Sequence, residues 1–238
     1  MTAPFIDIHT HRDGRAIADE GKLSCCHGFT YGIHPWWLAR EGYDPEPDLR
    51  RLEGLLQRDQ LAAIGEAGID KPCGASLDLQ AEVFGKHILL SEQYGKPLVI
   101  HQVKGVETVL RLHRQRQPRQ AWILHSFNGS AEEALQLTGR GIYLSVGAGI
   151  MFKNRKIVQS IKSIPLDHLF FETDTADLDV QVIYAQASTI LELPMEVLKE
   201  KIFANFARIN HTTWQTGKIA PDCSSATMAW INLERATF

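Results

Sequence analysis

The stretch that decides the fold is FIDIHTH, residues 5–11. Because the side chains of a strand point alternately to its two faces, Asp7, His9 and His11 share one face, and the two isoleucines take the other. Two histidines at this spacing on a rigid strand can bind one cation. Taken alone, the stretch is also compatible with a pair of solvated surface histidines.

Six more short apolar runs follow along the chain. They are residues 29–33, 61–64, 98–100, 121–124, 142–146 and 169–171. Near-continuous apolar runs are typical of strands that are buried on both faces of a parallel sheet. The sequence therefore predicts seven strands in one buried sheet.

Amphipathic helical patterns lie between these runs. We expect helices over 79–94 and 106–117, a third that begins at the capping box of Ser130, and a fourth that begins near Pro194. Alternating strands and helices indicate an α/β fold. A single TIM-type (β/α) barrel just fits a chain of 238 residues. No linker is visible, so we expect one domain over 1–238, in which 210–238 is a tail of unassigned role.

Composition excludes several classes of protein. The hydrophobic fraction of 44% and the charged fraction of 22% exclude disorder and low-complexity assemblies. The formal net charge of -3 gives no bulk attraction for nucleic acid, so a polyanion must be held by local charge. Four irregularly spaced cysteines (Cys25, Cys26, Cys73 and Cys223) indicate a reducing compartment rather than a disulfide scaffold. With no apolar leader or span in the sequence, we expect a cytoplasmic protein that does not enter a membrane.

Four later strands are each followed by an ionisable residue. These residues are Glu66, His101, His125 and Asp174. Any one of them is most simply a hydrogen-bonded loop residue, but in a barrel the carboxyl ends of the strands converge on one site. Burying such groups without partners is costly, so they must pair or bind metal. Together with His9 and His11 they form the donor set of a two-metal hydrolytic site.

Seven short motifs occur in a fixed order. They are DIHTH (7–11), GIHP (32–35), IGEAGID (64–70), VIH (99–101), HSFNGS (125–130), YLSVG (143–147) and ETD (172–174). Together they resemble the TatD family of metal-dependent deoxyribonucleases, which belongs to the amidohydrolase-like barrels. The resemblance covers residues 5 to about 209.

This resemblance implies two divalent metal ions and six ligands. The implied ligands are His9, His11 and Asp174 for the first ion, His101 and His125 for the second, and Glu66 for both. Glu66 and Asp174 would also be catalytic, with Asp174 steering the attacking water and moving its proton. Asp7, on the same strand face as the histidines, would orient one of these ligands without touching the metal itself. The mixed nitrogen and oxygen donors are compatible with Zn, Mg or Mn.

The resemblance also implies substrate-binding residues. His34 would lie near the substrate rather than on a metal, or would simply shape the loop beside Pro35. Trp36 stands where the family has a second histidine. Trp36 and Trp37 could stack on a base or could pack against a neighbouring helix.

A second departure from the family's motifs concerns the residue that would bind phosphate. Val103 stands where the family commonly has an arginine, and Lys104 or Gln102 could compensate. The favoured function is hydrolysis of a phosphodiester, with DNA or a similar substrate bound at the metal site. The alternatives are hydrolysis of a small amide, ester or lactone and, from another class, a metal-binding protein without turnover.

The interval between the first strand and GIHP is short. In the resembling family a helix, a strand and another helix lie there, whereas 12–33 can hold one strand and little more. We therefore expect a trimmed barrel with seven recognisable strands. The gap would widen the site or be covered by another subunit of a homo-oligomer.

Overall fold

A single curled parallel sheet forms the centre of the molecule. The computed structural model describes residues 3–11, 27–152, 156–210 and 227–232. Within them the strand order is β1-β8-β2-β3-β4-β5-β6-β7, and every neighbouring pair is parallel. The strands are β1 (Phe5–Thr10), β2 (His27–Tyr31), β3 (Ala63–Asp70), β4 (Leu98–Val103), β5 (Trp122–Leu124), β6 (Tyr143–Val146), β7 (Leu169–Phe171) and β8 (Thr227–Asn232).

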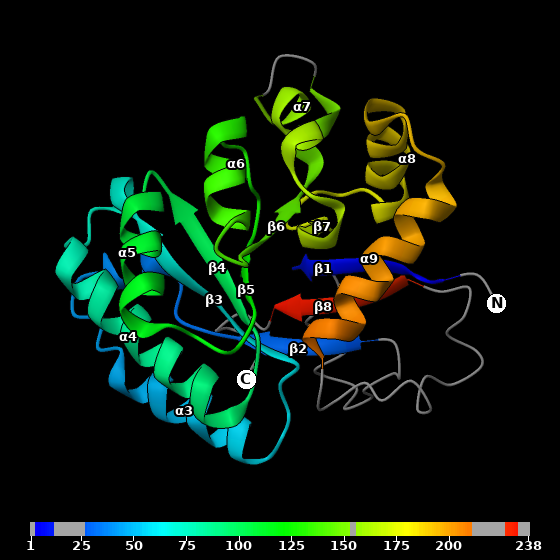
Figure 1. Cartoon of the computed structure of the whole chain (residues 1–238). Coiled ribbons are helices and arrows are strands. Elements are labelled where there is room, and N and C mark those ends of the chain that lie inside the picture. Colours follow the sequence, from blue (N-terminus) through cyan, green and yellow to red (C-terminus); the bar gives the residue numbers. More distant parts are fainter. Residues whose placement is uncertain (1–2, 12–26, 153–155, 211–226, 233–238) are drawn as a thin grey trace.

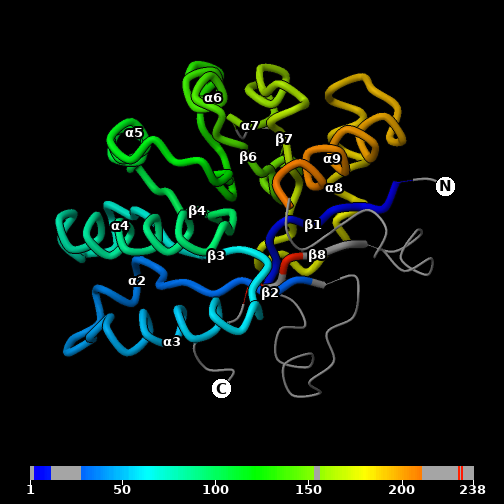
Figure 2. The backbone as a smooth tube through the Cα atoms, turned by 60° about the horizontal axis from the view of Figure 1, so that its bottom comes forward, coloured from blue at the N-terminus to red at the C-terminus, as the bar shows by residue number. Residues whose placement is uncertain are grey.

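The helices lie outside the curled sheet, as in a (β/α) barrel (Figure 2). They are α2 (Pro35–Leu38), α3 (Glu46–Gln57), α4 (Leu77–Tyr94), α5 (Val106–Arg116), α6 (Ala131–Thr138), α7 (Lys156–Ser160), α8 (Val180–Leu191) and α9 (Met195–Ile209), with 3-10 turns at Lys71–Cys73, Ala148–Met151, Ile161–Ser163 and Leu166–His168. The four expected helices correspond to α4, α5, α6 and α9, and the capping box of Ser130 and Glu133 is present. None of the helices in the described residues is long and apolar enough to cross a membrane.

The two edge strands of the sheet meet at their carboxyl ends. The amide of His11 donates to the carbonyl of Asp174, and the amide of Asp174 donates to the carbonyl of His9, both at 3.0 Å. These bonds join the end of β1 to the segment that follows β7. The predicted α/β barrel fold is confirmed as a curled, partly closed sheet, and the junction of its two edges carries three of the predicted metal ligands.

The eighth strand differs from expectation. All seven predicted strands are present, but β8 comes from the tail and lies between β1 and β2 (Figure 1). Its Ala229 is in register with Asp7 on one side and with His27 on the other. The expected gap is therefore filled by the chain itself. Residues 12–26 of the short interval, with Cys25 and Cys26, and Cys223 of the tail lie outside the described residues.

A buried tryptophan anchors β8 in the core. Trp230 is fully buried and its ring centroid lies 5.6 Å from that of Phe206 on α9. On the other side, Gly28 of β2 leaves the necessary room. A Cβ atom there would lie 2.5 Å from Ala62 Cβ, which is closer than a side chain permits, and would make a tight contact of 3.1 Å with Trp230 Cδ1.

A buried histidine ties the loop after β2 to helix α4. His87 Nε2 accepts a hydrogen bond from the amide of Ile33 at 3.0 Å. Its Nδ1 lies 2.8 Å from the carbonyl of Val83, to which it donates, since Nε2 is the acceptor. Burial lowers the pKa of His87 to about 4. The neutral ring thereby fixes the backbone immediately before His34.

The pH dependence of stability will carry the signature of His87. Its pKa is near 6.5 when unfolded and about 4 when folded, so the unfolded state binds the extra proton between these values. We expect His87 to remove about 3 kcal/mol of unfolding free energy as the pH falls from 7 to 4. Urea unfolding of the wild type and of His87→Gln at pH 7, 5.5 and 4 measures the difference. Parallel pH profiles for the two proteins would contradict this assignment.

Candidate metal centre

The structure brings all six predicted ligands together at the carboxyl ends of the strands. His9 belongs to β1, Glu66 to β3 and His101 to β4, while His11, His125 and Asp174 follow β1, β5 and β7. Parallel strands of a barrel end on one side, so residues far apart in sequence converge there. Five of the six line a cleft of about 1290 Å³, and His9 is fully buried beneath it.

Glu66 lies at the centre of the group. Its Oε2 lies 3.5 Å from His9 Nε2 and 3.4 Å from His11 Nε2. Its Oε1 lies 2.9 Å from His101 Nδ1 and 2.7 Å from His125 Nε2. Each carboxylate oxygen thus faces its own set of imidazole nitrogens, since His34 Nε2 also lies 3.4 Å from Oε1. This is the arrangement that a carboxylate bridging two cations requires.

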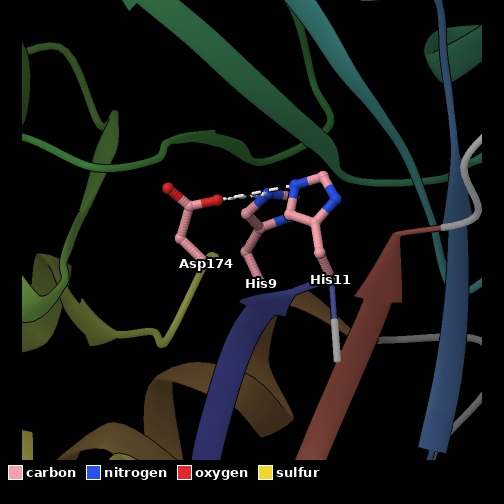
Figure 3. A group of neighbouring side chains, drawn as sticks. All are labelled: His9, His11 and Asp174. Atoms are coloured by element: carbon pink, nitrogen blue, oxygen red, sulfur yellow. Dashed lines mark ion pairs between the residues drawn. The ribbon is translucent and has the colours of Figure 1, made fainter. Parts of the chain in front are cut away.

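Asp174 completes the donor group on the Oε2 side of Glu66. Asp174 Oδ1 lies 3.5 Å from His11 Nε2 and 3.8 Å from His9 Nε2, and Figure 3 shows it facing both rings. One donor atom from each of the three residues lies within 4.8 Å of the others. Burial, and next the charge of Glu172, raise the pKa of Asp174.

The chemistry of His9 fits a cation at this point. The residue is fully buried, and neither ring nitrogen has a hydrogen-bond partner among the residues that the structure describes. A buried polar group without a partner is costly. Two ligands that bind one Zn²⁺ at about 2.1 Å in a tetrahedral site lie about 3.4 Å apart, close to the separations seen here. The donors therefore fit a divalent cation in both type and spacing.

The charged groups of the centre stabilise one another's ionised forms. Burial opposes ionisation of Glu66, but His125, His101 and His11 outweigh it and bring its pKa well below the usual range. Burial also opposes protonation of His125, but Glu66 and then Glu172 outweigh it and raise its pKa well above the usual range. Without a cation, the buried carboxylate and imidazolium thus stabilise each other.

Two carboxylates behind the ligands have no counterpart in the predicted set. Glu172 is fully buried, and its Oε1 lies 3.7 Å from His125 Nδ1 and accepts from the amide of Ser126 at 2.6 Å. Asp70 Oδ2 lies 3.0 Å from His101 Nε2. Asp70 and Glu66 share one face of β3 by strand periodicity, and that pattern could have identified Asp70.

Asp7 contacts the segment that carries the predicted ligand Asp174. Its two oxygens accept from the amide and the hydroxyl of Thr173, at 3.0 and 2.7 Å. It therefore fixes the segment that carries Asp174 instead of touching an imidazole. Burial raises the pKa of Asp7 to about 7.

His34 lies closer to the centre than the sequence suggests. His34 Nε2 lies 3.4 Å from Glu66 Oε1, and with His101 these residues form another group able to hold a metal ion. Its Nδ1 accepts from the amide of Trp36 at 3.1 Å and so caps α2. His34 thus combines the expected loop-shaping role with a nitrogen at the metal centre.

The two tryptophans differ in how far they are exposed. Trp36 is 59% exposed and lines the cleft, and its Nε1 donates to Asp70 Oδ2 at 2.7 Å. Trp37 is half-buried and packs near Tyr43, with ring centroids 6.5 Å apart. Both tryptophans line the cleft, but packing covers part of Trp37, whereas Trp36 offers the more exposed ring. Lys104, the third predicted substrate residue, is exposed at the same cleft.

Comparison with known proteins adds relatives to this geometry. A family model described as TatD related DNase matches residues 3–211. The uncharacterized metal-dependent hydrolase YabD of Bacillus subtilis is 36% identical over 151 residues, which are 62% of this chain and 59% of YabD. YcfH of Escherichia coli K12, also described as an uncharacterized metal-dependent hydrolase, is 27% identical over 199 residues, 77% of this chain and 73% of YcfH. Matches to the first four relatives span between 49% and 59% of their lengths.

Solved structures share the fold. YjjV, a TatD homolog from Escherichia coli K12, superposes with a TM-score of 0.75 at 18% identity, over 89% of this chain and 100% of that one. An uncharacterized amidohydrolase from Saccharomyces cerevisiae superposes with a TM-score of 0.66 at 14% identity, over 86% and 87% of the two chains. The family model covers most of the sequence and the cluster of donors lies within it, so this chain belongs to the TatD family.

Proposed function

We propose that this protein is a metal-dependent hydrolase that cleaves phosphodiester bonds in DNA. The observation that carries the proposal is the position of Glu66, whose two oxygens face two separate sets of imidazole nitrogens. Two cations, of Zn, Mg or Mn, would be held on either side of this carboxylate. When bound, they would lower the pKa of a water molecule and offset the negative charge that develops on the phosphate.

Asp174 is our candidate for moving the proton of the attacking water. It is half-buried at the cleft, and its Oδ1 lies 3.5 Å from His11 Nε2 and 3.8 Å from His9 Nε2, at the centre where the water would be bound. Its backbone is fixed on both sides, by hydrogen bonds to β1 and by the grip of Asp7 on Thr173. The carboxylate therefore has a defined position from which to steer water.

Asp70 would orient His101 for binding. The imidazole presents Nδ1 to Glu66 and Nε2 to Asp70, so the carboxylate behind it fixes which nitrogen faces the cation. Asp70 is itself held, because its amide donates to Gln80 Oε1 at 2.7 Å and its carbonyl accepts from Gln80 Nε2 at 3.0 Å. Helix α4 thus helps to fix the position of His101, because its Gln80 holds Asp70 and Asp70 contacts His101.

The rim of the cleft favours a nucleic-acid substrate. The exposed charged side chains that line the cleft are Arg40, Lys71 and Lys104 against Glu107, which leaves local positive charge on a chain of net charge -3. Trp36 presents an indole on which a base can stack. The cleft of about 1290 Å³ also exceeds the pockets of about 300–1,000 Å³ that suit small ligands. A strand of DNA fits these features better than a small amide, ester or lactone.

The first test combines metal analysis with assays on single-stranded DNA. We expect the purified protein to bind divalent metal and to degrade the DNA, with loss of activity on chelation. Asp174→Asn should lower kcat by about 10²–10⁴, because the group that accepts the proton is removed. Asp78→Asn is the matched control, since Asp78 is an exposed carboxylate in the first turn of α4.

Three outcomes separate the hypotheses. DNA cleavage that needs metal and Asp174 supports the nuclease. Bound metal with turnover of esters or amides but not of DNA would overturn it in favour of the small-substrate hydrolase. Bound metal without any hydrolysis would leave a metal-binding protein.

Loss of Asp70 should weaken metal binding. Asp70→Asn keeps the shape but removes the charge that orients His101, and such changes typically lower metal affinity about 10- to 100-fold. Titration with Mn²⁺ by calorimetry measures this, with Asp78→Asn again as the control. Equal Mn²⁺ affinities for Asp70→Asn and the wild type would remove Asp70 from the metal centre.

Substitution of Trp36 separates DNA binding from chemistry. Trp36→Ala should raise KM for single-stranded DNA about 5- to 150-fold, because base stacking contributes about 1–3 kcal/mol. Hydrolysis of bis(p-nitrophenyl) phosphate, whose groups are not bases of a strand, should change far less. A proportionate loss on both substrates would instead assign Trp36 to support of Asp70 and His101.

A further inference from the structure

The strand β8 ends at the metal centre. It lies between β1 and β2, and Figure 3 shows it running beside β1 toward the side chains of the site. Its last residue, Asn232, is in register with Thr30 of β2. Asn232 is only 9% exposed, and it lines the same cleft as the predicted ligands.

The side-chain amide of Asn232 has a defined orientation. Its Oδ1 accepts from the hydroxyl of Thr30, which is fully buried, at 3.4 Å. This leaves the NH₂ group for Glu66, and Nδ2 donates to Glu66 Oε2 at 3.4 Å. The amide therefore links β2 to the central carboxylate across two neighbouring strands.

The contact concerns one oxygen of Glu66 in particular. Oε2 is the atom that faces His9 and His11, whereas Oε1 faces His101 and His125. Rotation about the terminal torsion of a glutamate is loosely restrained, so hydrogen bonds decide the plane of the carboxylate. His101 and His125 restrain Oε1 at 2.9 and 2.7 Å, and the amide of Asn232 adds a donor on Oε2 that still leaves an acceptor site on this oxygen.

We propose that Asn232 is a positioning residue that holds Glu66 Oε2 toward the donor pair His9 and His11, so that β8 is part of the metal centre. The inference rests on the proposed function in that this donor pair binds a cation. It assigns to the last strand a role in the site beyond completion of the sheet.

Calorimetric titration of the full chain with Mn²⁺ tests the proposal. Asn232→Leu removes the donor at similar volume and should weaken one of two binding steps about tenfold or more. In a His11→Ala background, where that step is already lost, Asn232→Leu should have little further effect. In a His101→Ala background its effect should persist. This difference separates a positioning role from general damage to the strand, which would weaken binding in both backgrounds.

Thr30 supplies a second set of variants that leaves β8 intact. Thr30→Val removes the hydroxyl that orients the amide and should shift the same binding step in the same direction. Thr30→Ser retains the hydroxyl and should restore affinity. Equal affinities of the wild type, Asn232→Leu and Thr30→Val for two ions would overturn this inference and leave the proposed function standing. A wild type that binds no metal ion would overturn both.

Discussion

The structure depends on a buried, ionised carboxylate that is surrounded by imidazoles. Glu66 is only 5% exposed, and the side chains of His9, His11, His101 and His125 all lie within 3.5 Å of its oxygens. A charge in such a place is tolerated only with partners arranged around it. Four strand ends must therefore meet at one point, and a barrel of parallel strands is the architecture that brings them there.

The hydrogen bonds that join the two edges of the sheet also bring the donors of the site together. The two hydrogen bonds that join β1 to the segment after β7 run through His9, His11 and Asp174. Asp7 reinforces that junction through Thr173. Any change of register between β1 and the segment after β7 would separate the donors. The same backbone geometry therefore determines both the junction of the two edges and the arrangement of the site.

Local pattern predicts much of this arrangement. The seven apolar runs locate seven strands, and the ionisable residue after each of four of them is brought to the centre. Strand β8 was not predicted because parallel pairing joins distant segments, and the fit of Trp230 between Gly28 and Phe206 is visible only in three dimensions. Asn232 and Glu172 were not predicted for a related reason. Their roles depend on contacts with residues of other strands, which the spacing of residues along one strand does not reveal.

The position of β8 has a consequence for how the chain folds. Phe5 at the start of edge strand β1 pairs with Thr227, so the ladder between β1 and β8 joins the two most distant parts of the described sequence. Pairings of this kind raise contact order and slow folding. A chain synthesised only as far as α9 presents β1 and β2 as two unpaired edges, which invite association with other strands. Protection from aggregation is therefore completed last, together with the site itself.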